Sequence, residues 1–399
     1  MAKPLTATVP QHVEVESSSS TTVKAPSSHR SSRTFQSKVL ETLRCVVPMM
    51  TFLMFLYYSP KWVRSFANWA GIKTLPDGTI NYPWLEKFGT IFFFVMLCVT
   101  PMASPAVVAF ALLFTMIPAE AYYDYFHTYL SEHSQLFTLL VVIPLIINTT
   151  CWLNGLVMET CSHYDLWPCK GHKIQSKRQI QWGTTEFHKL LKKVFINTWI
   201  LVPFIALSTY PFQLHPEYGI YVDMDPDRRV SKLEMALHFV YYILVNEFIF
   251  FYGHWLFHAS SWCYRHIHKV HHEFPFPNGL AALYCHPAEL YIADFLPLGA
   301  GAFCINSSCS TLLLWCFFAV LATMTHHSGY RWPWTISIDH QPNFHDFHHE
   351  KFITNYGNLG FLDTIHGTDK LWREHQKELH RVRALKGKKA AELQNQFIE

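Results

Sequence analysis

The chain has 399 residues, a length that suits one large domain or two small ones. Hydrophobic residues make up 50% of it and charged residues only 15%, well below the roughly 25% of an ordinary soluble domain. The net charge of +3 is too small to indicate a nucleic-acid-binding protein. The ten cysteines form no CxxC pair, which argues against a cysteine zinc site. Because the apolar residues are gathered in runs, we expect an integral membrane protein.

Composition divides the chain into four parts. Residues 1–38 include the run ESSSSTTVKAPSSHRSS, which has too little apolar surface to fold, so we expect a disordered tail. Residues 39–232 hold several apolar segments and form an N-terminal membrane region. Residues 233–370 carry most of the unusual polar side chains and form the candidate-site domain. Residues 371–399 are a basic C-terminal tail.

Six apolar segments follow one another along the chain. A helix needs about 20 apolar residues to cross a bilayer, so the first is too short and is expected to be re-entrant or interfacial. Pro101 and Pro105 are expected to kink or split the second. The sixth is too long for one span and contains the turn signals PLGAGAF and NSSCS, which predict a helical hairpin. The segments are 46–58, 88–117, 136–152, 194–212, 233–252 and 290–325.

Lysine and arginine predict the orientation, because loops rich in them stay in the cytosol. The loop 158–193 has seven such residues and the loop 118–135 has none. Counting onwards places the ends of the fifth and sixth segments, and the basic tail, on the cytosolic side. Arg228, Arg229 and Lys232 in the loop 213–232 weigh against this orientation.

The spans therefore predict an all-α bundle of transmembrane helices, since only helices satisfy their own backbone polar groups in lipid at this length. Histidines are concentrated in the last third of the chain. The motif GHWLFH places His254 and His258 four residues apart, which is one helical turn. The motifs HKVHH and HDFHH each have the i, i+3, i+4 pattern of one helical face. Their histidines are His268, His271 and His272, and His345, His348 and His349.

Eight imidazoles on one side of a membrane predict two metal ions, since one ion takes about four to six ligands. His326 and His327 end the last apolar segment and can add a further ligand. Imidazole binds zinc, copper, iron and nickel, so the ligand type does not name the metal. Ordinary core or surface histidines would explain one such pair, but not three patterned clusters. We expect a helical cap on the cytosolic side to hold this dinuclear site.

Three other residues are candidates for supporting the site. Glu247 lies within an apolar segment, where a carboxylate is costly and needs a partner. We expect it either to hold a ligand histidine or to bind a neighbouring helix. His286 precedes a proline and either enters the site from a loop as a ligand or stays outside. The segment NYGNLGFLDTIHGTD either packs the tail onto the cap or folds over the site, with Asp363 hydrogen-bonded to a ligand histidine.

The motifs come in the order and spacing of a known superfamily. NEFIFFYGHWLFH, YRHIHKVHHEF, LYCHPAE, HHSGY, FHDFHH and NYGNLGFLDTIHGTD, between residues 236 and 370, resemble the fatty acid hydroxylase/sterol desaturase superfamily, and most of all its sterol 4-methyl oxidases. This resemblance makes 233–370 the catalytic domain and the eight clustered histidines, with His327, the ligands of two non-haem iron ions. Zinc can replace iron in isolated protein. A tenth histidine of some relatives is Arg331 here, so water or His286 would take its place.

The resemblance also implies a function. It predicts a monooxygenase of the endoplasmic reticulum membrane that uses dioxygen to oxidise a lipid taken from the bilayer. A b-type cytochrome with its reductase would supply electrons. The leading hypothesis is oxidation of a sterol 4-methyl group, and the close alternatives are sterol 25-hydroxylation, sterol desaturation and hydroxylation of fatty acyl or sphingolipid chains. A catalytically silent metal-binding protein is a further alternative. A metal transporter fits poorly, because its ligands would lie inside the spans.

Overall fold

The computed structural model describes most of the chain, and its regular elements there are all helices. The described residues are 35–58, 84, 87–92, 117, 119–167, 169–175, 180–331 and 340–396. Helix α1 (Phe35–Tyr58) begins inside the predicted tail, whose residues 1–34 lie outside the described residues. Most of the second apolar segment, with Pro101 and Pro105, also lies outside them.

Four helical segments are long and apolar enough to cross a membrane. They are Gln135–His163, which joins α6 (Gln135–Phe137), η1 (Thr138–Val142) and α7 (Ile143–His163); Thr185–Leu214, which joins α8 (Thr185–Phe195), η2 (Ile196–Leu201), α9 (Val202–Ser208) and α10 (Tyr210–Leu214); α11 (Lys232–Ala259); and α15 (Cys309–His326). They contain the third, fourth and fifth predicted segments and half of the sixth. The prediction of an all-helical membrane protein is confirmed.

The four candidate spans begin in the same way, with a hydroxyl side chain that caps the helix. Ser134, Thr184, Ser231 and Ser308 each accept a hydrogen bond from the backbone N–H three residues further on. These caps satisfy N–H groups that a helix end leaves free, and each contributes about 1 kcal/mol. Short polar signals thus set where the apolar helices start.

The sixth apolar segment is the predicted hairpin. One arm is η6 (Leu290–Phe295) with α14 (Leu296–Cys304), and the other is α15. The turn between them is held by Asp223, whose N–H donates to the Ser307 carbonyl at 2.8 Å and whose carbonyl accepts from the Cys309 N–H at 2.8 Å. The turn signal NSSCS lies at this turn, but the predicted turn signal PLGAGAF lies within α14, where Pro297 is tolerated because it stands in the first turn of the helix.

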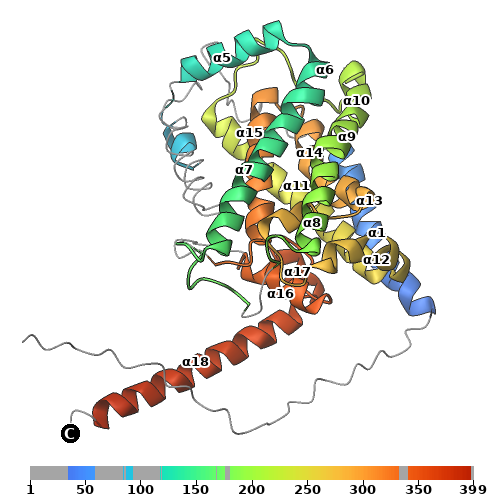
Figure 1. The fold of residues 1–399 in the computed structure, drawn as a ribbon. Coiled ribbons are helices and arrows are strands. Elements are labelled where there is room, and N and C mark those ends of the chain that lie inside the picture. The colour runs from blue at the N-terminus through green and yellow to red at the C-terminus, as the bar shows by residue number, and fades with distance from the viewer. Residues whose placement is uncertain are drawn as a thin grey trace, which may run out of the picture.

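Helix α11 lies at the centre of the bundle and packs against both α14 and α1 (Figure 1). Phe239 and Tyr242 of α11 contact Trp315 of α15, with ring centroids 5.5 Å apart in each case. The first apolar segment is part of α1, and its Phe52 stacks on Phe248 at 4.4 Å. Helix α1 is not among the four candidate spans.

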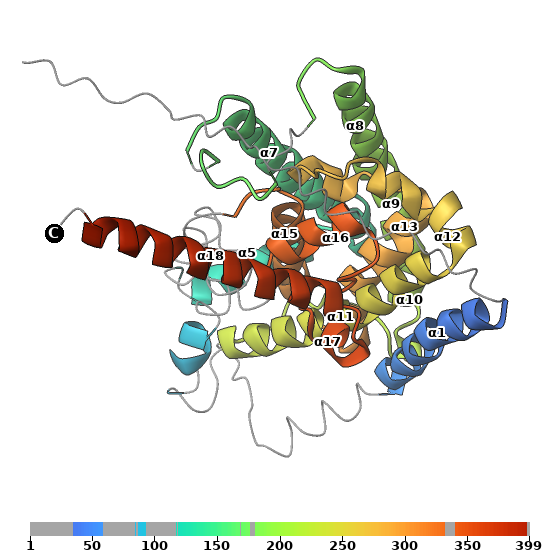
Figure 2. The same cartoon turned by 90° about the horizontal axis from the view of Figure 1, so that it is seen from below.

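One end of the bundle carries a cap of short helices. The segments α7, α11 and α15 end there, and α8 and η6 begin there (Figure 1). In Figure 2, seen from that side, α16 lies in front of α15 and α17 in front of α11. The remaining helices are α5 (Ala119–Glu132), η3 (Pro216–Tyr218), α12 (Ser261–His266), η4 (His268–Glu273), η5 (Gly279–Leu283), α13 (Pro287–Glu289), α16 (Asn343–Lys351), α17 (Phe361–His366) and α18 (Lys370–Gln396).

Close packing of α14 on α11 depends on Gly301. A Cβ at this position would lie 2.9 Å from Tyr242 Cδ1 and 3.2 Å from Tyr242 Cα. We predict that Gly301→Ala lowers the free energy of unfolding by about 1–3 kcal/mol, because overpacking forces the helices apart. Gly299→Ala is the matched control, since its nearest neighbour is 3.9 Å away. Thermal unfolding in detergent measures both, and equal melting temperatures for the two variants would contradict the prediction.

Candidate metal centre

Nine histidines form two groups that can each hold a metal ion. In each group the candidate ligand nitrogens all lie within 4.8 Å of one another. The first group has one ring from the third motif and four from the first two. The second group has one ring from η4, one from the end of α15 and two from α16. The first group is His254, His258, His268, His272 and His348, and the second is His271, His327, His345 and His349.

The spacing of the Nε2 atoms fits coordination of a common ion. In the first group, His268 Nε2 lies 2.7 Å from His258 Nε2 and 2.8 Å from His272 Nε2. In the second, His345 Nε2 lies 2.9 Å from His327 Nε2 and 3.1 Å from His349 Nε2. Two nitrogens bound at right angles to one ion, each about 2.1 Å from it, are about 3.0 Å apart.

The partners of the Nδ1 atoms fix the tautomer of three rings, two in the first group and one in the second. The Nδ1 atoms of His254, His327 and His348 lie 2.6–2.8 Å from the backbone carbonyls of Tyr356, Thr323 and Thr354. A carbonyl only accepts, so Nδ1 carries the proton and Nε2 of the neutral ring has a lone pair. Lone pairs that converge repel one another unless a cation lies between them. The donor set therefore fits a metal ion in each group.

Burial keeps the rings in the form that binds metal. It lowers the pKa of the candidate ligands outside the spans below the usual value of 6.5, and that of His348 to about 3. Neighbouring histidines lower the pKa values further, because two cationic rings repel each other. At neutral pH the rings are uncharged and their Nε2 atoms are free to coordinate.

The two groups are adjacent, as the sequence predicts. The ring of His349 lies 4.8 Å from that of His271 in its own group and 4.9 Å from that of His272 in the other. His268 and His348, which come from different motifs, belong to the same group. No carboxylate or thiol among the described residues belongs to either group. Ions bound here would have nitrogen ligands from the protein and remaining positions open to other ligands.

The middle motif departs from the predicted α-helix. Residues His268–Glu273 form the 3₁₀-helix η4 instead. Pro275 and Pro277 follow immediately, and proline disfavours helix in the residue before it, so a longer α-helix cannot continue. η4 lies between the two groups and supplies His268 and His272 to one and His271 to the other. Sequence spacing predicted two ions but not this division of the ligands.

Glu289 supports the first group, and the sequence analysis missed it. Its Oε1 accepts a hydrogen bond from His268 Nδ1 at 2.6 Å, and its side chain is buried. A carboxylate in this position fixes the ring and makes its other nitrogen a better ligand. The available signal was the motif LYCHPAE, which ends on this residue. His286 of the same motif is not in either group. Its Nδ1 accepts from the Ala288 N–H at 3.1 Å and caps α13.

Glu247 and Asp363 act on the site through the backbone. Glu247 Oε2 accepts from the N–H groups of Asn358 and Leu359, at 2.7 and 2.9 Å. Asp363 accepts from the N–H groups of Tyr356 and Gly357, at 2.8 Å each. The direct bond predicted between Asp363 and a histidine is replaced by an indirect one, because the Tyr356 carbonyl receives the Nδ1 proton of His254. The segment folds over the site, which is one of its two predicted roles.

His326 and Arg331 lie outside both groups. The ring of His326 is 6.4 Å from that of His345, and its side chain lines a cavity instead. Arg331 is exposed, and its N–H donates to the His172 carbonyl at 2.9 Å. The second group thus has four histidines and the first has five.

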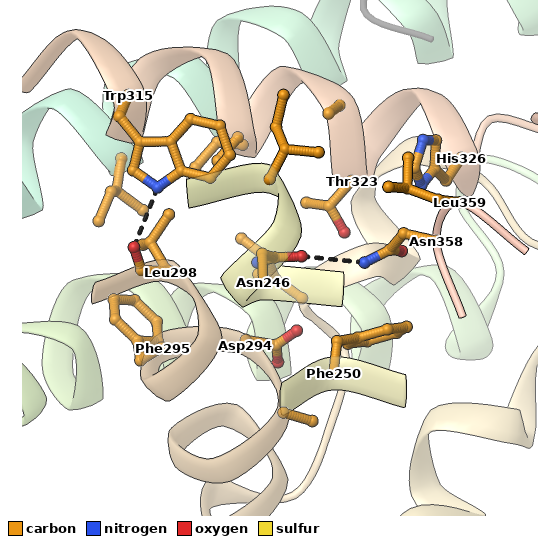
Figure 3. Close-up of a pocket in the computed structure, with 17 residues that line it drawn as sticks. Asn246, Phe250, Asp294, Phe295, Leu298, Trp315, Thr323, His326, Asn358 and Leu359 are labelled. Carbon is orange, nitrogen blue, oxygen red and sulfur yellow. Dashed lines mark hydrogen bonds between the residues drawn. The ribbon is translucent and has the colours of Figure 1, made fainter. Parts of the chain in front are cut away.

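A largely apolar cavity lies beside the two groups, among α7, α11, α14 and α15 (Figure 3). Its volume is about 130 Å³. Trp315, Leu298 and Phe295 line one side, while Asn358 and His326 lie at the other (Figure 3). Phe250, another lining residue, contacts the ring of His254 at 5.0 Å. The cavity therefore lies next to the candidate metal centre, with the Phe250 ring between it and His254.

Comparison with known proteins shows the family. The very-long-chain aldehyde decarbonylase GL1-11 of Oryza sativa subsp. japonica is 37% identical over 243 residues, which cover 58% of this chain and 86% of that protein. The sequence profile described as fatty acid hydroxylase matches residues 239–368. The chain belongs to the fatty acid hydroxylase/sterol desaturase family. The profile covers all nine clustered histidines, and the family resemblance seen in the motifs is confirmed.

Other relatives match over a shorter stretch. Fatty acid hydroxylase domain-containing protein 2 of Homo sapiens is 39% identical over 142 residues, 36% of this chain and 40% of that protein. Methylsterol monooxygenase 2-2 of Arabidopsis thaliana is 36% identical over 151 residues, 36% of this chain and 56% of that protein. The chain thus spans about half the length of these two relatives. No solved structure matches it.

The division of the ligands predicts separate metal losses. We expect His272→Ala to remove the ion of the first group and His349→Ala the ion of the second, so that each variant retains about one ion per chain where the parent has two. Elemental analysis of purified protein measures the ratio. His286→Ala is the control and should keep both ions, because His286 only caps α13. Two ions in either ligand variant would contradict the assignment.

Because Asp363 acts on His254 through the backbone, its replacement should weaken metal binding in the first group only. Asn at this position presents an amide to N–H groups that need an acceptor, so the Tyr356 carbonyl should shift away from His254. We predict that Asp363→Asn lowers metal affinity of the first group about tenfold and leaves the second unchanged. Chelator titration of the folded protein measures this. Glu350→Gln, an exposed change on α16, is the control. If Asp363→Asn leaves the metal affinity of the first group unchanged, the segment only packs the C-terminal tail onto the cap.

Proposed function

We propose that this protein is a membrane-bound non-haem di-iron oxygenase that uses dioxygen to oxidise a lipid, with the 4-methyl group of a sterol as its target. The observation that carries the proposal is the pair of adjacent all-histidine groups beside an apolar cavity within the membrane bundle. The likeness to methylsterol monooxygenase 2-2 supports a sterol substrate.

The chain's own residues perform three tasks in this proposal. The nine histidines would hold two iron ions, and the carbonyls of Tyr356, Thr323 and Thr354 orient the rings of His254, His327 and His348. When bound, the ions would supply the redox chemistry that an unactivated C–H bond requires. The apolar cavity walls would exclude water and hold part of the hydrocarbon near the histidines. Imidazole ligands suit several metals, and the family resemblance favours iron.

A lipid substrate fits the position of the cavity. Residues of three candidate spans and of the hairpin arm formed by η6 and α14 line it, so a lipid would enter from the bilayer without crossing water. We place the protein in the endoplasmic reticulum membrane with its histidines toward the cytosol. The basic loop after α7 and the basic helix α18 support this orientation. Arg228, which weighed against it, pairs with Asp223 and Glu234.

The reaction needs electrons from a donor, for which we propose a b-type cytochrome with its reductase. Support comes from a basic surface beside η4, formed by Lys189, Lys192, Lys193, Arg265 and Lys269. Lys269 follows directly on His268 in the chain, so a donor bound there would be close to the ligands. A carboxylate-rich partner would be attracted to this surface.

The donor surface is tested by reversing two of its exposed charges, in Lys192→Glu and Arg265→Glu. We predict a several-fold lower rate of reduction by the cytochrome at low salt and a smaller difference at high salt, since salt screens charges. Product formed in a single turnover after chemical reduction should be unchanged. Lys377→Glu, on the exposed side of α18, is the control. Equal reduction rates in all three variants would remove this surface from the proposal.

Other substrates remain as alternatives with their own support. The match to the aldehyde decarbonylase spans 86% of that relative. This coverage favours a long-chain aldehyde as a second candidate substrate. Fatty acyl or sphingolipid hydroxylation and sterol desaturation would use the same metal centre. A catalytically silent metal-binding protein would keep the histidines without turnover.

Lipid analysis of cells lacking the protein tests the proposal. We predict that 4-methylsterols accumulate and that the parent chain, but not His272→Ala, restores normal levels. Unchanged sterols with loss of 2-hydroxylated acyl chains would favour the acyl hydroxylase, and accumulation of long-chain aldehydes would favour the decarbonylase. No lipid change, together with no dioxygen consumption by the reduced and metal-loaded protein, would support the silent protein.

A further inference from the structure

The two histidine groups differ in how completely their ligands are enclosed. Eight of the nine clustered histidines are at most 7% exposed, and the exception is His258 of the first group, which is partly exposed. Its Nε2 lies 2.7 Å from that of His268 and 3.2 Å from that of His272, so it is a full member of the group. The edge at His258 is therefore where the candidate metal centre reaches the surface of the cap.

The side chain of Tyr264 covers this edge. It belongs to α12, the six-residue helix between the first two motifs, which Figure 2 shows at the outer margin of the cap. Its ring centroid lies 5.5 Å from that of His258 and 6.2 Å from those of His268 and His272. Tyr264 is itself partly exposed. One surface side chain thus contacts three of the five ligands in the first group.

Phe352 covers the same group from the end of α16. Its φ of 64° lies in the left-handed region, which a bulky side chain rarely adopts. Its N–H donates to the His348 carbonyl at 2.7 Å, and its ring meets that of His272 edge-on, with centroids 4.9 Å apart. Phe352 is also partly exposed. A strained backbone that holds an aromatic ring against a ligand indicates that the position of the ring matters.

Exchange of a bound ion requires an opening, and the smallest one is at Tyr264. On its inner side His258 contacts Tyr356, with ring centroids 5.1 Å apart. Tyr356 is buried and its carbonyl holds His254, so it cannot move without displacing a ligand. An exposed side chain, in contrast, changes rotamer within nanoseconds, and short surface segments open locally at low cost. Movement of Tyr264 or of α12 would uncover His258 while the other ligands stay in place.

We propose that metal ions enter and leave the first group at the His258 edge, and that Tyr264 and Phe352 form an aromatic gate that sets the rate of this exchange. The second group, whose four ligands are all buried, would exchange more slowly. The inference concerns metal loading and does not rest on the substrate or reaction of the proposed function. A gate acts on the barrier in both directions. It therefore changes the rates of uptake and release by the same factor and leaves the affinity unchanged.

Stopped-flow zinc exchange tests the gate without requiring turnover. Uptake by metal-free protein and release from loaded protein to a fluorescent chelator are measured in detergent, at high salt so that the charge of the neighbouring Arg265 is screened. We expect Tyr264→Ala and Phe352→Gly each to raise both rates of the faster phase several-fold, with an unchanged dissociation constant. Glycine suits position 352 because it adopts a positive φ without strain. His272→Ala, which removes the first-group ion, should lack the faster phase.

Two control variants separate the gate from a general effect on α12. Tyr264→Phe keeps the ring and should exchange zinc at the parent rate. Trp262→Ala should do the same, because Trp262 lies on the same helix but is 60% exposed and its ring contacts His266 instead of a ligand.

The outcomes decide between a gate and simple support of the ligands. Parent rates in both Tyr264→Ala and Phe352→Gly would overturn the gate. Faster release with unchanged uptake, and hence weaker binding, would also overturn it, because the two rings would then only stabilise the ligand positions. Equal acceleration of uptake and release in both variants supports the gate, and the same result in one variant alone assigns the gate to that ring.

Discussion

The constraint on which the rest of the structure depends is the packing of nine imidazole rings, eight of them buried, whose Nε2 atoms converge on two points. Where the Nδ1 proton is held by a backbone carbonyl, the opposite nitrogen presents a lone pair to its neighbours. Such an arrangement is unfavourable without a cation and favourable with one. The cap is therefore organised around metal ions: metal binding and packing of the cap helices stabilise the same arrangement.

The segment between α16 and α17 carries much of this organisation. The carbonyls of Thr354 and Tyr356 receive the protons of His348 and His254, and the N–H groups of residues 356–359 bind Asp363 and Glu247. Gly357 lies between the two carboxylates, where a Cβ would be 2.5 Å from Glu247 Oε1 and 2.9 Å from Asp363 Oδ2. A carboxylate placed within a membrane helix thus anchors a loop of the cap, which explains why its burial is tolerated.

The same segment connects the metal centre with the cavity. Asn358 bonds through its backbone to Glu247 and through its side chain to Asn246, and it also lines the cavity beside His326. A ligand that contacts this wall therefore contacts the loop that orients His254. Membrane helices supply the apolar space, the cap supplies the ligands, and a few polar side chains lie where the two meet.

The sequence by itself determined the membrane class, the hairpin and the histidines that gather at the centre, because bilayer thickness and helical periodicity are local rules that a single stretch must obey. It did not reveal how the ligands divide between two groups, since η4 and α16 each supply both. The sequence also did not reveal most of the hydrogen-bond acceptors that orient the histidine rings. Backbone carbonyls such as that of Tyr356 exist at every residue, so no side-chain pattern marks the ones that matter. Only the tertiary structure decided that Glu289 would hold His268, that His286 would cap a helix and that His326 would line the cavity, because each role depends on which distant segment lies opposite.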